Sequence, residues 1–330
     1  MEQLTQRLLN DFQHNFPLNS LPFEKIARDL NTTTDTVLRE LKQLQEKGAV
    51  SRVGPVFRPN TVGVSTLAAS AVPVTELETI AAIINQFPQV NHNYEREHHY
   101  NLWFVVTATD HQDLEQTLKR IEAKTGYPIL VLPLLRDYHI DLGFRMRLDE
   151  QSSIKVMAEL PTCQHEETLP DRTQDAEDLI EVIQGGIPLV ARPYQAIAQR
   201  LGCSERSVIE QLNSMINSGV IKRLGVVVRH HELGYRANAM VVWNVPDARV
   251  DQLGEQLGRQ DCVTLCYQRP RLLPQWPFNL FCMVHGSDRK DVIDCINRMI
   301  DGLGLETIEH DVLFSGRRFK QRGARYRVRN

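Results

Sequence analysis

Two short segments of this chain combine arginine, histidine, tyrosine and tryptophan at spacings that could do chemistry. Residues 91–104 read Asn-His-Asn-Tyr-Glu-Arg-Glu-His-His-Tyr-Asn-Leu-Trp-Phe, and residues 266–286 include Tyr-Gln-Arg-Pro-Arg, Trp-Pro-Phe-Asn-Leu-Phe and a closing His-Gly. An arginine beside an aromatic ring can hold a carboxylate through two parallel hydrogen bonds. A histidine can donate a proton near neutral pH or ligate a metal. This composition favours a large anionic ligand.

The two segments correspond to each other. Tyr94-x-Arg96 matches Tyr267-x-Arg269, and Tyr100-Asn101-Leu102 matches Phe278-Asn279-Leu280. The second segment is five residues longer, and prolines surround its Trp276. Prolines restrict the backbone, so we expect a stiff loop that can wall a flat ligand.

Each of these residues also has an ordinary structural explanation. Strand alternation predicts that Tyr94, Arg96 and His98 share one face, but an arginine on a strand is more often solvated or ion-paired. His285 follows the apolar run 280–284 and could simply end a strand. Repetition of Tyr-x-Arg and Asn-Leu shifts the balance towards function, although common ancestry of the two segments explains part of it.

An internal repeat places both segments in the chain. A shift of 171 residues aligns residues 17–63 with a later stretch without a gap, pairing for example Arg58 with Arg229. The polar stretch 149–173 contains two prolines and few large apolar residues, which predicts a linker between two copies.

Each copy begins with three helical patterns. In the first copy a helix follows Pro22, the polar turn 31–33 comes next, and Thr34 is expected to cap a third helix that stops at Gly48. The β-branched run 50–57 then predicts a wing. The pattern indicates a winged helix-turn-helix.

After the wing the periodicity changes to strand–helix–strand–strand–helix–strand. This order predicts a ferredoxin-like βαββαβ unit, with an antiparallel sheet and both helices on one face. The fold class is therefore α+β, with two tandem copies of a helix-turn-helix and a ferredoxin-like domain. The expected boundaries are 1–64 and 65–148 for copy one, 149–173 for the linker, and 174–236 and 237–330 for copy two.

Charge disfavours nucleic acid as the main partner. The 330 residues carry 38 basic and 41 acidic side chains, a net charge of −3, and the exposed positions of both third helices mix acids, amides and few bases. The charge is uneven, however, because a basic run lies near the C-terminus. This run could contribute to binding an anionic partner, or it could simply be a solvated tail. That run comprises Arg317, Arg318, Lys320, Arg322, Arg325, Arg327 and Arg329.

Cysteine use and hydropathy suggest a cytoplasmic protein. The six cysteines form no Cys-x-x-Cys pair, so zinc-finger and redox motifs are not indicated, and reduced thiols are expected. No apolar run is long enough to span a bilayer, and residues 1–20 are too polar for a signal peptide.

Together these features resemble the Lrp/AsnC family. Segments 93–104, 267–271, 276–281 and 285–286 resemble one subgroup in particular, the sirohaem decarboxylases known as the Ahb and Nir proteins. Copy one looks like the D-type subunit and copy two like the L-type, so the chain resembles a fused D–L form. The resemblance covers nearly the whole chain.

The resemblance implies redox-neutral removal of two acetate carboxyl groups from sirohaem, giving 12,18-didecarboxysirohaem on the way to haem d1. It implies no cofactor beyond the iron of the substrate. His98 and His285 would act as general acids, or one of them as a ligand to that iron. The substrate-binding residues would be Tyr94, Arg96, Tyr267, Arg269, Arg271 and Trp276, with Arg58, Arg229 and His230 reaching in from the wing region.

The same resemblance implies a pseudo-dimeric chain whose ligand domains pair through their sheets. Two chains could associate into a homodimer, and a paralogous subunit pair could assist. The copies are not equivalent, because Thr107 stands where copy two has His285. Either one copy forms a complete site, or both contribute to a single site. Two rival functions remain open, an effector-sensing transcriptional regulator and a haem carrier without turnover.

Overall fold

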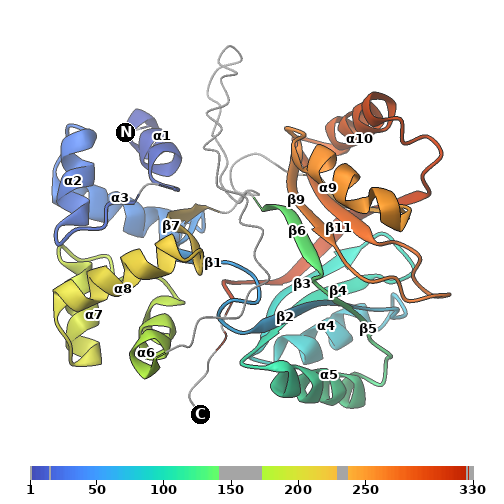
Figure 1. The fold of residues 1–330 in the computed structure, drawn as a ribbon, viewed down its shortest axis with the longest axis horizontal. Helices are drawn as coiled ribbons and strands as arrows, with labels where there is room; N and C mark the ends of the chain where they lie inside the picture. Colours follow the sequence, from blue (N-terminus) through green and yellow to red (C-terminus); the bar gives the residue numbers. More distant parts are fainter. Residues whose placement is uncertain (1, 15, 141–172, 229–236, 325, 327–330) are drawn as a thin grey trace.

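The computed structural model describes residues 2–14, 16–140, 173–228, 237–324 and 326. Figure 1 shows two units, a helical one and a layered one built on strands. Arg229, His230 and residues 149–172 of the predicted linker lie outside the described residues.

The helical unit contains both predicted helix-turn-helix segments (Figure 1). Its third helices begin with side-chain caps, in which Thr33 accepts from the Thr36 N–H at 3.3 Å and Ser204 accepts from the Ser207 N–H at 3.1 Å. The first cap is therefore one residue earlier than predicted. The helices are α1 (Glu2–Asp11), α2 (Pro22–Asp29), α3 (Thr34–Glu46), α6 (Gln174–Ile183), α7 (Pro193–Leu201) and α8 (Glu205–Asn217).

The predicted wings form a shared sheet instead of separate hairpins. Strands β1 (Val50–Phe57) and β7 (Ile221–Val228) pair antiparallel with each other. Val53 and Val226 are fully buried in one core that contains side chains from both copies. A free wing would expose these valines, so pairing across the copies is the favourable arrangement.

The layered unit confirms the two βαββαβ patterns. Each copy has strand order 4-1-3-2, as a ferredoxin-like sheet requires. Copy one contributes β2 (Val64–Ser70), α4 (Leu77–Asn85), β3 (Val90–Arg96), β4 (Leu102–Ala108), α5 (His111–Thr125) and β5 (Leu130–Pro133). Copy two contributes β8 (Ala237–Trp243), the short 3-10 helix η2 (Asp247–Arg249), α9 (Val250–Gly258), β9 (Val263–Gln268), β10 (Leu280–Gly286), α10 (Arg289–Leu303) and β11 (His310–Gln321).

The copies exchange strands at their edges. The order across the joined sheet is β5-β2-β4-β3-β11-β8-β10-β9-β6. Strand β11 pairs first with β8 of its own copy and then with β3 of copy one. Strand β6 (Arg136–Ile140), which the sequence did not predict, follows β5 and pairs with β9 of copy two. The chain is thus an internal pseudo-dimer, as expected.

An apolar layer lies between the two copies. It joins side chains of β2, β4 and β5 to those of β8, β10 and β11, and Trp276 from the β9–β10 loop completes it. Separate clusters lie between each sheet and its own helices. We call the surface of each sheet that meets this layer its inner face.

The basic C-terminal run is only partly accounted for by a solvated tail. Arg317 pairs with Glu95 at 2.7 Å and Glu78 at 2.5 Å. Lys320 donates to the carbonyls of Asn85 at 2.7 Å and Phe87 at 3.1 Å. Arg317 and Lys320 therefore bind β11 of copy two to residues of copy one. Arg325, Arg327 and Arg329 lie outside the described residues.

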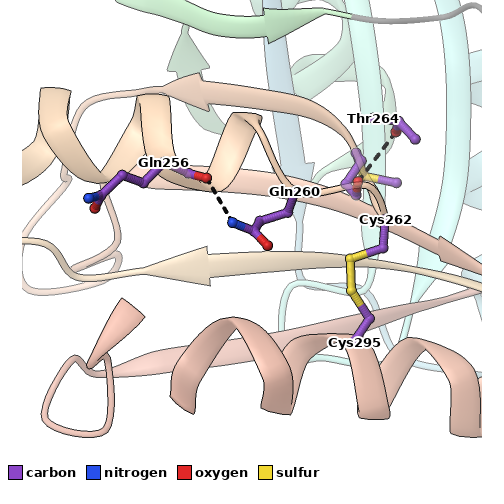
Figure 2. Close-up of a disulfide and its surroundings, with 6 residues drawn as sticks. Gln256, Gln260, Cys262, Thr264 and Cys295 are labelled. Carbon is purple, nitrogen blue, oxygen red and sulfur yellow. Dashed lines mark hydrogen bonds between the residues drawn. A yellow bond between two sulfur atoms is a disulfide. The ribbon is translucent and has the colours of Figure 1, made fainter. Parts of the chain in front are cut away.

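One disulfide corrects the expectation that every thiol is reduced. Cys262 at the start of β9 is bonded to Cys295 in α10 (Figure 2). The two residues are 33 positions apart in sequence, so only the packing of α10 beneath the sheet brings them together. Cys203, Cys266 and Cys282 are free. Within the described residues, no helix has the length and apolar character needed to cross a membrane.

Candidate active site

Strand registers define which residues of the two copies are equivalent. Leu67 of copy one lies between Val105 and Leu132, just as Met240 of copy two lies between Met283 and Leu313. The same registers make Thr107 equivalent to His285, Ser65 to Asn238 and Leu130 to Asp311.

The arginines of the repeated Tyr-x-Arg motif make reciprocal contacts across the copies. Arg96 donates through Nη1 to the Leu313 carbonyl at 3.0 Å, and Arg269 donates through Nη1 to the Leu132 carbonyl at 2.5 Å. Since Leu132 and Leu313 are equivalent, the two contacts are related by the pseudo-twofold axis. Each arginine therefore ties its hairpin to the last strand of the other copy.

Both guanidinium groups are held away from solvent. Burial lowers the pKa of Arg96 and that of Arg269 to about 10 in each case, although each nearby tyrosine opposes the shift. Arg269 lies over the rings of Tyr267 and Phe281, at 5.4 and 5.8 Å from their centroids. Among the residues that the structure describes, none is a hydrogen-bond partner of its buried Nε. The motif arginines are thus interface residues as well as candidate carboxylate ligands.

Polar and titratable groups gather around Arg96. Its Nη1 also donates to Ser315 Oγ at 3.0 Å, and that hydroxyl donates to Asn238 Oδ1 at 2.5 Å. Asn238 is the direct cross-strand neighbour of His285. We call this group the histidine side, and it consists of Arg96, His98, Asn238, His285, Asp311 and Ser315.

His98 lies in the β3–β4 turn and not on the strand, so the predicted alternation does not extend to it. Its Nδ1 accepts the Tyr100 N–H at 2.9 Å, which leaves the proton of the neutral ring on Nε2. That Nε2 faces Asp311 Oδ2 at 3.5 Å. Burial lowers the pKa of His98, and Asp311 acts in the opposite direction.

His285 is the penultimate residue of β10, and its ring contacts Thr264 of β9. Its Nδ1 lies 3.1 Å from Thr264 Oγ1, which in turn lies 3.3 Å from the Met283 carbonyl. A hydroxyl has one proton, so donation to that carbonyl makes the hydroxyl an acceptor for Nδ1–H. The acceptor nitrogen of His285 is then Nε2. Its backbone N–H donates to the carbonyl of Cys262, at the disulfide of Figure 2, at 3.2 Å.

The pseudo-symmetric counterpart carries different groups, and we call it the arginine side. Thr107 there accepts from Asn91 Nδ2 at 2.8 Å. Arg271, two residues beyond Arg269 as His98 is beyond Arg96, donates to Asn244 and to the Pro277 carbonyl, both at 3.0 Å, and pairs with Asp247. The arginine side consists of Ser65, Thr107, Leu130, Leu132 and Arg269.

Trp276 belongs to the core and is not an open wall. It is 1% exposed and packs on Trp103 at 5.3 Å between ring centroids. It also meets His98 edge-on at 5.7 Å and Tyr100 at 6.0 Å. A loop of copy two therefore supports the turn of copy one that carries His98. The proline-rich loop therefore holds a buried tryptophan, whereas the sequence predicted that this loop forms the wall of a ligand site.

The remaining predicted residues lie at different places. Tyr94 stacks on His92 at 6.1 Å, and Tyr267, whose pKa is raised by burial, pairs with Phe281. Arg58 follows β1, and its backbone N–H donates to the Val220 carbonyl at 2.9 Å, so it belongs to the end of the two-stranded sheet. Arg229 and His230 lie outside the described residues.

Sequence reasoning missed Asn238, Thr264, Asp311 and Ser315. Each is a common polar residue on a strand, and no motif marks it. Within the part of the chain that the structure describes, no group of three or more His, Cys, Asp or Glu side chains could hold a metal ion.

Known families match both halves of each copy. A model described as the AsnC-like ligand binding domain matches residues 61–139 and 232–320. A model described as the siroheme decarboxylase NirDL-like HTH domain matches residues 5–50 and 177–222. The siroheme decarboxylase NirDL subunit of Paracoccus pantotrophus is 40% identical, over 98% of this chain and 97% of the relative. The chain belongs to the siroheme decarboxylase NirDL family.

A solved structure shares the architecture of this family member. The crystal structure of the siroheme decarboxylase NirDL is 26% identical, has a TM-score of 0.71 and covers 98% of this chain and 93% of its own. A second crystal structure of that protein, in complex with an iron-uroporphyrin III analogue, matches equally well. A shorter relative, the siroheme decarboxylase NirH subunit of P. pantotrophus, is 42% identical over 48% of this chain and 97% of the relative.

Proposed function

We propose that this chain is a sirohaem decarboxylase, a carboxy-lyase that removes two acetate carboxyl groups from sirohaem. The product would be 12,18-didecarboxysirohaem, an intermediate of haem d1 biosynthesis. The observation that carries the proposal is the histidine side of a NirDL family member. There Arg96 of copy one bonds to Ser315, Ser315 bonds to Asn238 beside His285, and His98 faces Asp311.

The chemistry is balanced without a redox cofactor. Each acetate side chain loses carbon dioxide and gains one proton, so that it becomes a methyl group. The electron pair of the broken carbon–carbon bond passes into the macrocycle, which accepts it once a ring carbon is protonated. The protein then has to bind carboxylates and supply protons, and the iron is part of the substrate.

The hydrogen bonds suggest different roles for the two histidines. We assign His98 as the general acid in its protonated, imidazolium form, which the neighbouring carboxylate of Asp311 favours. His285 presents Nε2 as its acceptor nitrogen, which suits ligation of the substrate iron. Thr264 fixes that orientation, as hydrogen bonds from the far nitrogen commonly do for ligating histidines.

Carboxylate binding is assigned to the arginines near the hairpins. Arg96, Arg269 and Arg271 carry forked donors that match carboxylates, but each is engaged with protein oxygens. Substrate binding would exchange some of these contacts. Tyr94, Tyr267 and Trp276 would shape the pocket, and Arg58, Arg229 and His230 would contribute from the wing region.

Assembly and location follow the same proposal. A homodimer of pseudo-dimeric chains and a paralogous subunit pair are both proposed, and the existence of a NirH relative supports the pair. We further propose a cytoplasmic enzyme without a role in DNA binding, since pairing of the wings in one sheet and the mixed charge of the third helices both oppose it.

The two rival functions are less well supported. A transcriptional regulator would resemble other regulators over its full length, whereas the full-length relatives of this chain are named decarboxylases. A carrier would bind sirohaem and leave its mass unchanged.

The test is anaerobic incubation of the purified protein with sirohaem, followed by product mass. Loss of one or two carbon dioxide units establishes the enzyme, and His98→Ala and His285→Ala rank the two histidines. A shifted absorption spectrum with unchanged mass indicates a carrier or sensor, or an enzyme that needs its paralogous partner, which a repeat with that partner added separates. Absence of binding would refute the proposal.

A further inference from the structure

Arg52, on strand β1 of the helical unit, is a largely buried cation without an acidic partner. Burial lowers its pKa, and Tyr326 is the neighbour that opposes this shift. Its Nη2 donates to the Pro55 carbonyl at 2.9 Å. Within the described residues, no carboxylate pairs with Arg52 and no atom accepts from its buried Nε or from Nη1. A buried charge without a counter-ion is costly, so this guanidinium is suited to an anion from outside the chain.

His92 of strand β3 offers a second donor beside this cation. Burial and the charge of Arg52 lower its pKa to about 4, so the imidazole is neutral near neutral pH. The ring stacks on Tyr94 at 6.1 Å, and no residue that the structure describes is hydrogen-bonded to its nitrogens. A neutral imidazole has one N–H, which can donate to a carboxylate that an arginine also holds.

The C-terminal end of β11 brings the two residues together. Gln321 pairs with His92 in the sheet, and a Cβ added at Gly323 would lie 2.6 Å from Arg52 Nη1. A side chain at position 323 would therefore displace the guanidinium. Asn91, the residue before His92, donates to Thr107 of the arginine side at 2.8 Å. The two units of Figure 1 thus meet next to the arginine side, and the helical unit supplies the cation.

Copy two lacks this arrangement. The 171-residue shift makes Arg223 the equivalent of Arg52, and Arg223 Nη1 donates to the Gln13 carbonyl at 3.0 Å. Leu265 stands where copy one has His92. The arginine of copy two therefore has a structural partner for its Nη1, whereas Arg52 and His92 keep donors for a ligand.

We propose that Arg52 and His92 form a carboxylate-binding subsite, which holds one peripheral carboxylate of the tetrapyrrole substrate. The inference rests on the proposed function, in which sirohaem supplies the carboxylates. It gives the helical unit a part in substrate binding. The two sides then have different tasks, since the substrate is anchored next to the arginine side and reacts at the histidine side.

The experiment is an absorption titration of the full-length protein with iron-uroporphyrin III, which requires no turnover. Arg52→Gln should raise the Kd about 10- to 100-fold, because a charge-assisted hydrogen bond is lost. Arg28→Gln is the matched control. It removes the same charge from an exposed arginine that is paired with Glu24 at 3.4 Å, and it should leave the Kd within about twofold of the original.

Two further variants test the geometry of the subsite. Gly323→Ala keeps every charge and displaces the guanidinium, so it should also weaken binding. His92→Leu introduces the residue type of copy two and should raise the Kd by less, about 2- to 10-fold, since it removes a neutral donor. With sirohaem, Arg52→Gln should raise KM and leave kcat within about threefold, as expected for an anchor that binds the ground state and the transition state alike.

The titration separates this inference from the proposed function, which product mass tests. If sirohaem is not decarboxylated, a Kd that depends on Arg52 still supports the subsite. An unchanged Kd in folded Arg52→Gln, an equal loss in Arg28→Gln, or no binding by the unmodified protein would overturn it. If Arg52→Gln does not fold, the same titration of Gly323→Ala decides.

Discussion

The histidine side and the arginine side have the same backbone architecture and different chemistry. Both have a motif arginine that donates to the equivalent carbonyl of the other copy, at Leu313 or at Leu132. The histidine side has the titratable residues His285 and Asp311, where the equivalent positions of the arginine side are Thr107 and Leu130. The shared contacts hold the copies together, and from the differing residues we propose one catalytic centre per chain.

The largest expected effect on the rate of decarboxylation comes from giving the histidine side a residue of the arginine side. His285→Thr introduces the residue type found at Thr107 and should lower the rate of carbon dioxide loss about 10²- to 10⁴-fold, because a proton-handling or iron-binding group is removed. The measurement is initial rate with sirohaem by product mass. Thr107→Ala is the control and should retain the original rate. Comparable losses in both variants would mean that both sides are catalytic.

Trp276→Ala tests how far the two hairpins depend on one buried anchor. The indole is 1% exposed and contacts Trp103, Phe278 and Phe281. Its removal should lower the free energy of unfolding by about 3 kcal/mol through lost burial and a cavity, measured by urea denaturation. Tyr100→Ala, a half-buried neighbour, should cost less. If Trp276→Ala is nearly neutral, the ring is not a structural anchor.

Replacing each motif arginine distinguishes its contribution to stability from its contribution to catalysis. Arg96→Met and Arg269→Met each leave a buried carbonyl without its donor, so each should lower the unfolding free energy by about 1–3 kcal/mol. Only Arg96→Met should also impair turnover strongly, since Arg96 belongs to the histidine side. Denaturation and steady-state kinetics on the same preparations check this. A kinetic defect confined to Arg269→Met would reverse the assignment of sides.

The smallest effect concerns acid sensitivity in copy one. Burial and the charge of Arg52 lower the pKa of His92 to about 4, below its usual value of 6.5. As the pH falls through 6.5, the unfolded chain binds the proton first, so stability is lost between about pH 6.5 and 4. At about pH 5.5 the loss should be about 1 kcal/mol.

His92→Leu provides the comparison for this prediction, because Leu265 is the equivalent residue of copy two. The difference in unfolding free energy between the two proteins should be constant above about pH 6.5 and should change below it, because the leucine variant loses less stability on acidification. Parallel curves would show that another group causes the acid sensitivity.

Sequence patterns predicted the architecture closely, whereas the roles that they assign to single residues remain predictions. Helical and strand periodicity located both βαββαβ units, since these signals are local. Strand β6 was missed because its five residues pair only with the other copy. His98 and His285 were found by their unusual setting, whereas Asp311 has no local signal.

Burial was also not predicted for two of the proposed site residues. Arg96 and Trp276 were expected to line a ligand pocket, and both are buried at the junction of the copies. Alternation identifies which residues share a face, but it does not say whether that face meets solvent or a second sheet.

The sequence by itself determined the repeat, the α+β class and the candidate segments, because hydrophobic periodicity and motif spacing are properties of neighbouring residues. Only the tertiary structure decided the exchange of strands, the burial of the motif arginines and the pairing of His98 with Asp311. These depend on docking of two sheets that bring together residues as distant as Arg96 and Leu313, 217 positions apart. Contacts at such separations arise from burial of a shared apolar layer, which no local pattern encodes.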